Sequence, residues 1–344
     1  MELPPPACLT GCPDSLTISF VKAFVTGGTG FVGSHLVDRL LEREGVEVFA
    51  LVRDPKNLKW LEGRDVHLVE GDLFSLPELP RDLDFVFHIA GLTKAHQVAD
   101  YYTVNQEGTA SLFQSLRAQR LRPRAVVHLS TVAAAGPSGP DGPRDERRPP
   151  RPVSHYGRSK LYGEYEALRF SRDFPVVILR AGVVYGARDK GFLDYFKFVK
   201  RGIAPSFGLR RSPFSLCFIH DLVKALISAG QAGLSSGELI NVSDPAPATW
   251  DDIGSAAARI LGRRTVLIRI PLPLTFLAAS VSELARLFSR KASLISLDKY
   301  KEVRQTAWVT DVSKAARLLD FAPSVSLEEG LERTLRWYLE KGWL

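Results

Sequence analysis

The amino-acid sequence predicts an α/β fold in which a doubly wound parallel sheet is followed by a smaller, mixed α/β domain. Three observations lead to this prediction. Short apolar runs rich in β-branched residues alternate with helical patterns from residue 22 to residue 186, as a parallel sheet requires. A glycine-rich turn joins the first strand to the first helix. After Gly186 the patterns become shorter and proline becomes more frequent, which indicates a second domain.

The first strand, turn and helix form a phosphate-binding motif. Residues 22–33 read KAFVTGGTGFVG and continue into the helical pattern SHLVDRLLE. Gly27 allows the tight turn, Gly30 lets backbone approach a pyrophosphate, and Gly33 lets the helix pack on the strand, while the helix N-terminus supplies N–H donors. A bland glycine-rich turn is the alternative, but the motif has the preceding strand and following helix that confirm it. The sequence therefore predicts a Rossmann-type dinucleotide site.

The remaining elements follow in order along the chain. Strands are predicted at residues 46–52, 66–72, 83–91, 125–131 and 176–186, and helices at 101–119 and 156–172. A second helix and strand, at 218–230 and 238–242, are predicted to return to the sheet. We therefore expect an NAD(P)-binding domain at residues 21–186, with 216–243 returning to it, and a substrate-binding domain made mainly of residues 187–215 and 244–344.

Composition excludes several classes of protein. The 344-residue chain is 45% hydrophobic and 24% charged, and it has no apolar run of the ~18 to 20 residues that a membrane span needs. Its net charge of +7 is spread over short clusters without interleaved aromatic residues, so nucleic acid is not an expected partner. Cys8, Cys12 and Cys217 have no ligand or disulfide spacing, so we expect no metal site and reduced thiols in the cytoplasm.

Residues 1–20 are expected to be a disordered tail. They are rich in proline and lack the basic start and continuous apolar segment of a signal peptide. Met1 is the only methionine, and VKAFVTGG reads like the start of a protein, so Val21 written from a GTG codon is an alternative initiator. A native peptide spanning Cys12 to Lys22 in mass spectrometry would exclude that alternative.

Tyr156 and Lys160 form a candidate catalytic pair. They stand at positions i and i+4 of a predicted helix, so they share one face, and they follow Ser130 and Thr131 at a strand end. A nearby ammonium lowers the pKa of a phenol from about 10, so Tyr156 can exchange a proton with a ketone or an alcohol. Thr131 would hold the substrate oxygen. The pair alone usually marks a solvated helix face, but its position after the glycine motif favours catalysis.

With these motifs the chain resembles the extended short-chain dehydrogenase/reductase family, which contains NAD-dependent epimerases, dehydratases, β-hydroxysteroid dehydrogenases and dihydroflavonol reductases. The resemblance covers about residues 22–344 through TGGTGFVG, GDL, FHIAG, VNQEGT, LST, YGRSK and LRAGVVYG. It implies that Thr131, Tyr156 and Lys160 are catalytic, with Ser130 a less favoured choice, and that Asn105 steadies the proton relay. It also implies a cofactor site lined by Gly27, Thr29, Gly30, Phe31, Val32, Gly33, Asp72, Leu73, Ala90, Gly91, Tyr156 and Lys160.

Some supporting residues have an ordinary structural explanation as well. Asp72 could cap a turn and Asn105 could cap a helix. His88, in an apolar strand, is interpreted as a core histidine.

The residues after the second strand indicate which cofactor is used. NAD-specific folds carry an acidic residue at that strand's end, whereas an arginine suits the 2′-phosphate of NADP. Val52 stands about where the acid would be, and Arg53 follows it, with Lys56 and Lys59 nearby. NADP(H) is therefore the predicted cofactor. NAD(H) stays open because of Asp54, and a solvated basic loop is the structural alternative.

The substrate class is inferred from a missing asparagine. Nucleotide-sugar members resemble one another in an Arg-Tyr-Phe-Asn pattern after the sixth strand, whereas this chain has Leu179-Arg180-Ala181-Gly182. The chain looks more like the reductase branch, near bacterial ketosphinganine and ketoceramide reductases. We therefore expect NADPH-dependent reduction of a ketone on a keto-sphingoid, ketoceramide or steroid, or oxidation of the alcohol. The alternatives are a nucleotide-sugar epimerase or dehydratase with retained NAD, and a non-catalytic sensor, which would lack Tyr156 or Lys160.

Residues 271–291 are predicted to form a helix with an apolar stripe and a basic end. The stripe contains Leu277, Val281, Leu284 and Phe288, and the basic end contains Arg286, Arg290 and Lys291. Such a helix could cover a lipid-binding cleft or rest on the inner face of the membrane, or it could pack on its own domain. The expected partners are thus an apolar ketone and, as an option, a membrane surface, with the chain a monomer or homodimer.

Overall fold

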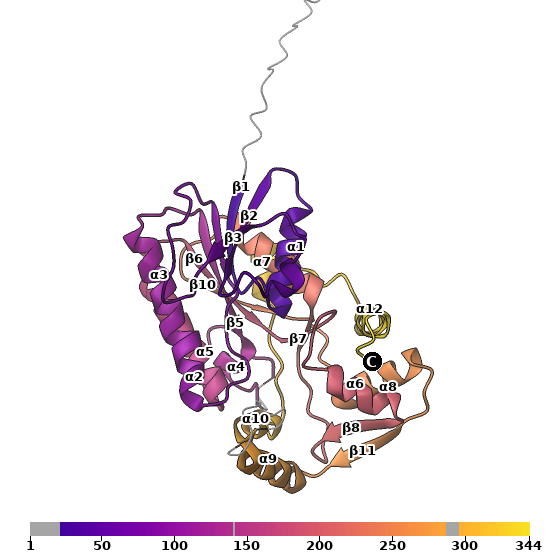
Figure 1. Cartoon of the computed structure of the whole chain (residues 1–344). Coiled ribbons are helices and arrows are strands. Elements are labelled where there is room, and N and C mark those ends of the chain that lie inside the picture. The colour runs from indigo at the N-terminus through magenta and orange to yellow at the C-terminus, as the bar shows by residue number, and fades with distance from the viewer. Residues whose placement is uncertain (1–20, 140–141, 287–295) are drawn as a thin grey trace, which may run out of the picture.

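A computed structural model describes residues 21–139, 142–286 and 296–344, with side chains at 284–286 excluded. The predicted tail, Cys8 and Cys12 lie outside these residues. The centre of the molecule is a seven-stranded sheet in which every neighbouring pair is parallel (Figure 1). Its order is β10-β6-β5-β4-β1-β2-β3. These strands are β1 Val21–Thr26, β2 Val46–Val52, β3 His67–Glu70, β4 Phe85–His88, β5 Ala125–Thr131, β6 Val176–Ala181 and β10 Glu238–Val242.

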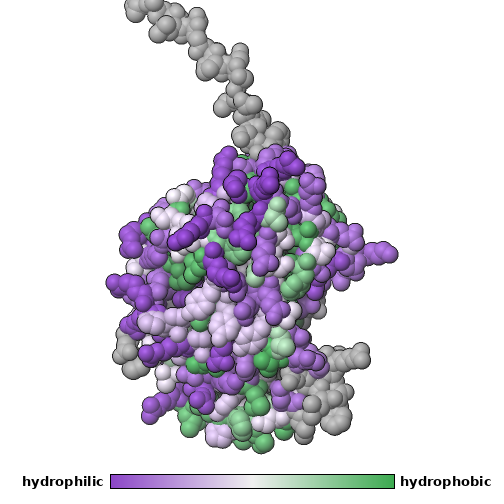
Figure 2. Space-filling view, turned by 90° about the vertical axis from the view of Figure 1, so that its left-hand side faces the viewer, coloured by the Kyte–Doolittle hydropathy of each residue, from purple (hydrophilic) through white to green (hydrophobic). Residues whose placement is uncertain are grey.

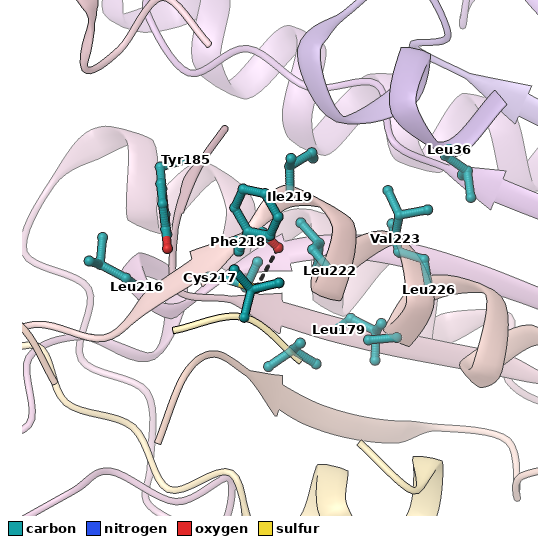
Figure 3. Close-up of a cluster of buried hydrophobic side chains, with 14 of the residues drawn as sticks. Leu36, Leu179, Tyr185, Leu216, Cys217, Phe218, Ile219, Leu222, Val223 and Leu226 are labelled. Atoms are coloured by element: carbon teal, nitrogen blue, oxygen red, sulfur yellow. Dashed lines mark hydrogen bonds between the residues drawn. The ribbon is translucent and has the colours of Figure 1, made fainter. Parts of the chain in front are cut away.

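Helices cover both faces of the sheet, so the predicted doubly wound α/β fold is confirmed. Leu112 and Phe113 belong to one core cluster, together with Ala167, whereas Leu36 and Leu226 belong to the other. The helices of the first layer are α2 Val98–Tyr102, α3 Gly108–Ala118 and α5 His155–Arg169, and those of the second are α1 Phe31–Leu41 and α7 Ile219–Gln231 (Figure 1). Figure 3 shows the second cluster, in which side chains of α7, among them Val223 and Leu226, lie between Leu36 of α1 and Leu179 of β6.

The C-terminal part adds a smaller mixed α/β region below the sheet (Figure 1). It contains two parallel strand pairs, β7 with β9 and β8 with β11. Their bounds are β7 Val183–Tyr185, β8 Ile203–Phe207, β9 Leu216–Phe218 and β11 Val266–Ile270. The remaining helices are α4 Val132–Ala135, α6 Leu193–Lys200, α8 Trp250–Ile260, α9 Leu272–Arg286, α10 Leu297–Val303, α11 Ser313–Leu319 and α12 Leu327–Glu340.

Two predicted elements are interrupted. The strand expected at 176–186 divides at Gly182, because Gly182 N–H bonds to Val242 whereas Val183 N–H bonds to Ser215 on the other strand pair. The helix expected at 101–119 begins at Val98 and contains a π-helical segment, Thr103–Glu107. Such segments are frequent at functional sites.

The strand order changes direction at β1, which pairs with β2 on one side and β4 on the other. Ligands of open α/β sheets bind at the carboxyl ends of the strands at such a switch point. The glycine turn follows β1 directly and Ala90 follows β4. We therefore expect the ligand site at the carboxyl ends of these two strands.

Candidate functional site

The glycine turn has the close packing that the sequence predicts. Gly27 has a φ of +75°, and a Cβ added there would lie 2.7 Å from the backbone nitrogen of Ala90. A Cβ on Gly33 would lie 2.1 Å from the carbonyl oxygen of Gly27. Both positions therefore require glycine, the first because of its left-handed backbone and the second because helix α1 meets the turn.

The start of α1 suits an anion. Gly30 caps the helix without a side-chain hydrogen bond, and the first turn has no acidic residue. Its backbone N–H groups thus keep their hydrogen-bonding capacity and their partial positive charge for a phosphate. Thr29, Phe31 and Val32 line this turn and are partly exposed. The turn therefore fits the pyrophosphate of a dinucleotide.

Other predicted cofactor residues stand at the same sheet edge. Ala90 N–H donates to the hydroxyl of Thr26 at 3.2 Å, which joins the ends of β1 and β4. Asp72 accepts the N–H groups of Phe74 and Ser75, each at 2.8 Å, so its side chain does cap a turn. Leu73 is buried next to Gly108. None of these contacts tests whether Asp72 and Leu73 bind the adenine of the cofactor, so that role stays a prediction.

Arg53 is exposed directly after β2. Its guanidinium makes no hydrogen bond or ion pair to the part of the chain that the structure describes, whereas nearby Asp54 is engaged with the N–H of Lys56 at 2.9 Å. Arg53 is therefore available for a phosphate.

Asn105 joins the cofactor edge to helix α5. It lies in the π-helical segment, and its amide nitrogen donates to the Ser159 hydroxyl at 2.9 Å and to the Leu92 carbonyl at 3.0 Å. Its carbonyl oxygen accepts the Leu92 N–H at 2.7 Å. The Asn105 side chain thus positions Leu92, next to Gly91, and Ser159, which lies between Tyr156 and Lys160 in the sequence.

The structure brings the three predicted catalytic residues together. Thr131 is the last residue of β5, and Tyr156 and Lys160 lie in the first half of α5. The Thr131 hydroxyl accepts the Ala133 N–H at 3.2 Å and lies close enough to Tyr156 to influence its pKa. The Lys160 ammonium donates to the Leu129 carbonyl at 2.7 Å and would stand 3.6 Å from a Cβ on Gly91. Both hydroxyls and the ammonium therefore converge on the edge where the glycine turn lies.

The expected effect of Lys160 on Tyr156 is not found in this structure. Burial raises the pKa of Tyr156 above its usual value, and the charge of Glu302 adds to the rise, while the nearby Thr131 hydroxyl opposes it. Burial also lowers the pKa of Lys160, to about 8. The prediction of a depressed tyrosine pKa was wrong here because the ammonium is itself desolvated and is directed to a carbonyl. Tyr156 therefore holds its proton at neutral pH.

A buried ion pair below this site was not anticipated. Arg180 of β6 donates to both carboxylate oxygens of Glu164, at 2.8 and 2.6 Å, and Ser130 also donates to Glu164. Ser130 is thus occupied by a structural contact, whereas Thr131 lies beside Tyr156. Glu164 follows Lys160 by four residues, so its place on the same helical face was a usable sequence signal.

Helix α10 caps the helix that carries Tyr156. The Asp298 carboxylate accepts the N–H groups of His155 and Tyr156 at 2.7 and 3.1 Å, and Glu302 accepts the Ser154 hydroxyl at 2.6 Å. An acidic group at a helix N-terminus stabilises the helix. Tyr156 and Asp298 are 142 residues apart in the sequence, so no local pattern predicts this contact.

The histidine interpretation agrees with the structure. His88 is buried and bonds the hydroxyls of Thr26 and Thr109 at 2.8 and 3.0 Å. Burial lowers its pKa to about 3, so it is neutral and structural. Its ring stacks on His128 of β5, with ring centroids 5.0 Å apart.

Comparisons with known proteins identify the family. The sequence profile of the NAD dependent epimerase/dehydratase family matches residues 23–243. Ceramide reductase of Caulobacter vibrioides is 29% identical over 93% of this chain and 95% of its own length. The 4-hydroxy-2-methyl-3-oxo-4-farnesyl-3,4-dihydroquinoline-1-oxide ketoreductase of Stigmatella aurantiaca is 27% identical over 91% and 95%. The crystal structure of UDP-glucuronic acid 4-epimerase from Bacillus cereus with UDP-glucuronic acid and NAD superimposes with a TM-score of 0.76 at 25% identity, over 93% of this chain and all of the other.

Proposed function

We propose that this protein reduces a ketone on a lipid-like substrate with NADPH. The chain belongs to the NAD-dependent epimerase/dehydratase family and is an NAD(P)-dependent enzyme that acts on CH–OH groups. The observation that carries the proposal is the position of Thr131, Tyr156 and Lys160, which lie together at the carboxyl edge of the sheet. Burial raises the pKa of Tyr156, so its phenol carries the proton that a ketone would accept. Reduction of a ketone needs a proton donor at this place.

The residues divide the work as follows. A nicotinamide dinucleotide, when bound, supplies the hydride. Tyr156 donates its hydroxyl proton to the carbonyl oxygen as that oxygen becomes an alcohol, and Thr131 holds the same oxygen in reach. Lys160, beside Gly91, is proposed to bind the cofactor ribose, while the glycine turn and Arg53 bind the phosphates.

Three features support an apolar substrate. No asparagine follows Arg180 until Asn241, which is buried and bonds the backbone carbonyls of Arg144 and Asp311. Val183, the third residue after Arg180, stands where the pattern has its asparagine, and this apolar side chain is 38% exposed. The names of the two relatives above refer to a ceramide and to a farnesylated ring system.

The test is a panel of β-keto lipids, ketosteroids and sugar nucleotides with NADPH as reductant. Each buried methylene contributes ~0.8 kcal/mol, so a chain shortened by four carbons should lose about 3 kcal/mol of transition-state binding, roughly 200-fold in kcat/KM. Steady-state kinetics over a series of chain lengths measure this slope. A flat series, or activity with a sugar nucleotide and none with a keto lipid, would reject the proposal.

A nucleotide-sugar epimerase with retained NAD is the second candidate. The observation in its favour is the similarity to the UDP-glucuronic acid 4-epimerase. An epimerase regenerates its cofactor within each turnover, so tightly bound NAD in the purified protein, with conversion of UDP-glucuronic acid, would support this candidate.

Replacement of Arg53 by alanine is expected to weaken NADPH binding and to spare NADH. The 2′-phosphate distinguishes the two cofactors, and a charge-assisted hydrogen bond to it contributes ~1.5 to 3 kcal/mol, about 10- to 150-fold in affinity. Titration of both cofactors by fluorescence measures the ratio, with the exposed Arg81→Ala as the control variant. Equal losses for NADPH and NADH would show that Arg53 does not bind the 2′-phosphate.

A further inference from the structure

Helix α9 has its large apolar side chains on the outside. Leu274, Leu277 and Val281 are 56, 58 and 59% exposed, whereas Thr275 and Ala279 are 3 and 0% exposed. The exposed residues are spaced i, i+3 and i+7 and form one stripe. The predicted stripe is thus present at Leu277 and Val281, while Leu284, Phe288 and the basic end lie outside the described side chains. Thr275 and Ala279 thus pack on the protein, and the stripe lies on the side of α9 that the described residues leave exposed.

Strand β11 extends the same surface. Val266 and Ile268 are 67 and 44% exposed, and Leu209, in the loop after β8, is 67% exposed. The guanidinium of Arg269 donates to the Leu209 carbonyl at 2.9 Å, which holds that loop against the strand. We define the α9–β11 face as Leu209, Val266, Ile268, Leu274, Leu277 and Val281. Figure 2 shows hydrophobic side chains at the lower end of the molecule, where Figure 1 places α9.

The chain around this face is basic. Residues 195–220 and 253–282 contain nine lysines and arginines and no aspartate or glutamate, with Asp194, Asp251, Asp252 and Glu283 just outside them. Asp251 pairs with Arg211 and Arg269, and Asp194 pairs with Lys197. Among these cations, Arg201, Arg210, Arg263 and Arg264 are exposed and make no ion pair with a described residue. The face therefore combines an apolar surface with uncompensated positive charge.

We propose that the α9–β11 face docks on an anionic lipid bilayer. Apolar side chains enter the interfacial region, while arginines beside them attract acidic headgroups. A second copy of the chain fits less well, because the same cations would face each other across the contact. Of the described helices, none has the length and hydropathy of a membrane span, so the contact proposed is peripheral.

The face is connected to the proposed active site. Phe276 of α9 contacts Tyr300 of α10, with ring centroids 5.3 Å apart, and Asp298 of α10 caps the helix that begins at His155 and carries Tyr156. Helix α10 thus links α9 to the helix that carries Tyr156. Docking itself does not depend on the proposed reaction, because vesicle binding is measured without turnover.

The test is flotation of the purified full-length chain with lipid vesicles. We expect binding to vesicles of phosphatidylcholine mixed with phosphatidylglycerol, and little binding to phosphatidylcholine alone or at high salt. The double variant Leu274→Asp/Leu277→Asp should bind at least ~10-fold more weakly, because charged groups replace the apolar contact. Leu339→Asp, on an exposed leucine of α12, is the matched control and should bind as wild type does.

A second pair of variants tests the charge. Arg263→Gln/Arg264→Gln should bind about 30-fold more weakly, since each basic residue near an anionic surface contributes about fivefold. Arg81→Gln/Arg172→Gln changes the net charge equally at other exposed positions and should leave binding unchanged. Equal binding to neutral and anionic vesicles would overturn the proposal. So would no vesicle binding together with a homodimer, in light scattering, that Leu274→Asp/Leu277→Asp dissociates.

Discussion

Replacement of Tyr156 by phenylalanine is expected to lower kcat about 100- to 10,000-fold while cofactor affinity stays nearly unchanged. The variant removes the hydroxyl and its proton, and a positioned general acid contributes a factor of this size. The ring remains, so its packing against Tyr101, at a centroid distance of 6.0 Å, is kept. Turnover with saturating substrate and a cofactor titration on the same preparation measure the two quantities.

Tyr162→Phe is the matched control. Tyr162 lies on the same helix and is 37% exposed, so loss of its hydroxyl should leave kcat within about twofold of wild type. Near-normal turnover by Tyr156→Phe, with the control also active, would exclude Tyr156 as the proton donor. Lys160→Ala is expected to differ from both variants, because it should weaken cofactor binding as well as rate.

Removal of the Glu164 carboxylate is expected to cause the largest loss of stability. Glu164→Ala leaves the guanidinium of Arg180, 3% exposed, without its carboxylate partner. Breaking a buried pair in this way costs about 3 to 5 kcal/mol in the free energy of unfolding. Urea denaturation followed by circular dichroism measures the change.

Glu329→Ala provides the comparison. Glu329 pairs with Arg333 on the surface of α12, and exposed pairs of this kind contribute about 0 to 1 kcal/mol. The double variant Glu164→Leu/Arg180→Met should recover part of the loss, because it removes both charges rather than one. A loss below about 1 kcal/mol in Glu164→Ala would show that Arg180 finds another partner or reaches water.

The candidate site was predicted from sequence where its parts are local. The glycine turn, Tyr156 with Lys160, and Thr131 at a strand end each depend on spacing within one element, and that spacing determines which residues share a turn or a helical face. Asn105 and Glu164 show the limit of this approach. Asn105 was expected from the family resemblance alone, and its bonds to Leu92 and Ser159 need the π-helical segment. Glu164 had a signal in its helical spacing, but its partner Arg180 is on a neighbouring strand.

The sequence by itself determined the parallel sheet and the family, because hydrophobic periodicity and short motifs encode them directly. Only the tertiary structure decided that Tyr156 keeps its proton, that Asp298 caps the catalytic helix and that α9 turns its leucines outward. These properties depend on which distant segments meet and on how much water they exclude. The spacing of neighbouring residues determines neither the contacts between distant segments nor the exclusion of water. Both are determined only when the whole chain folds.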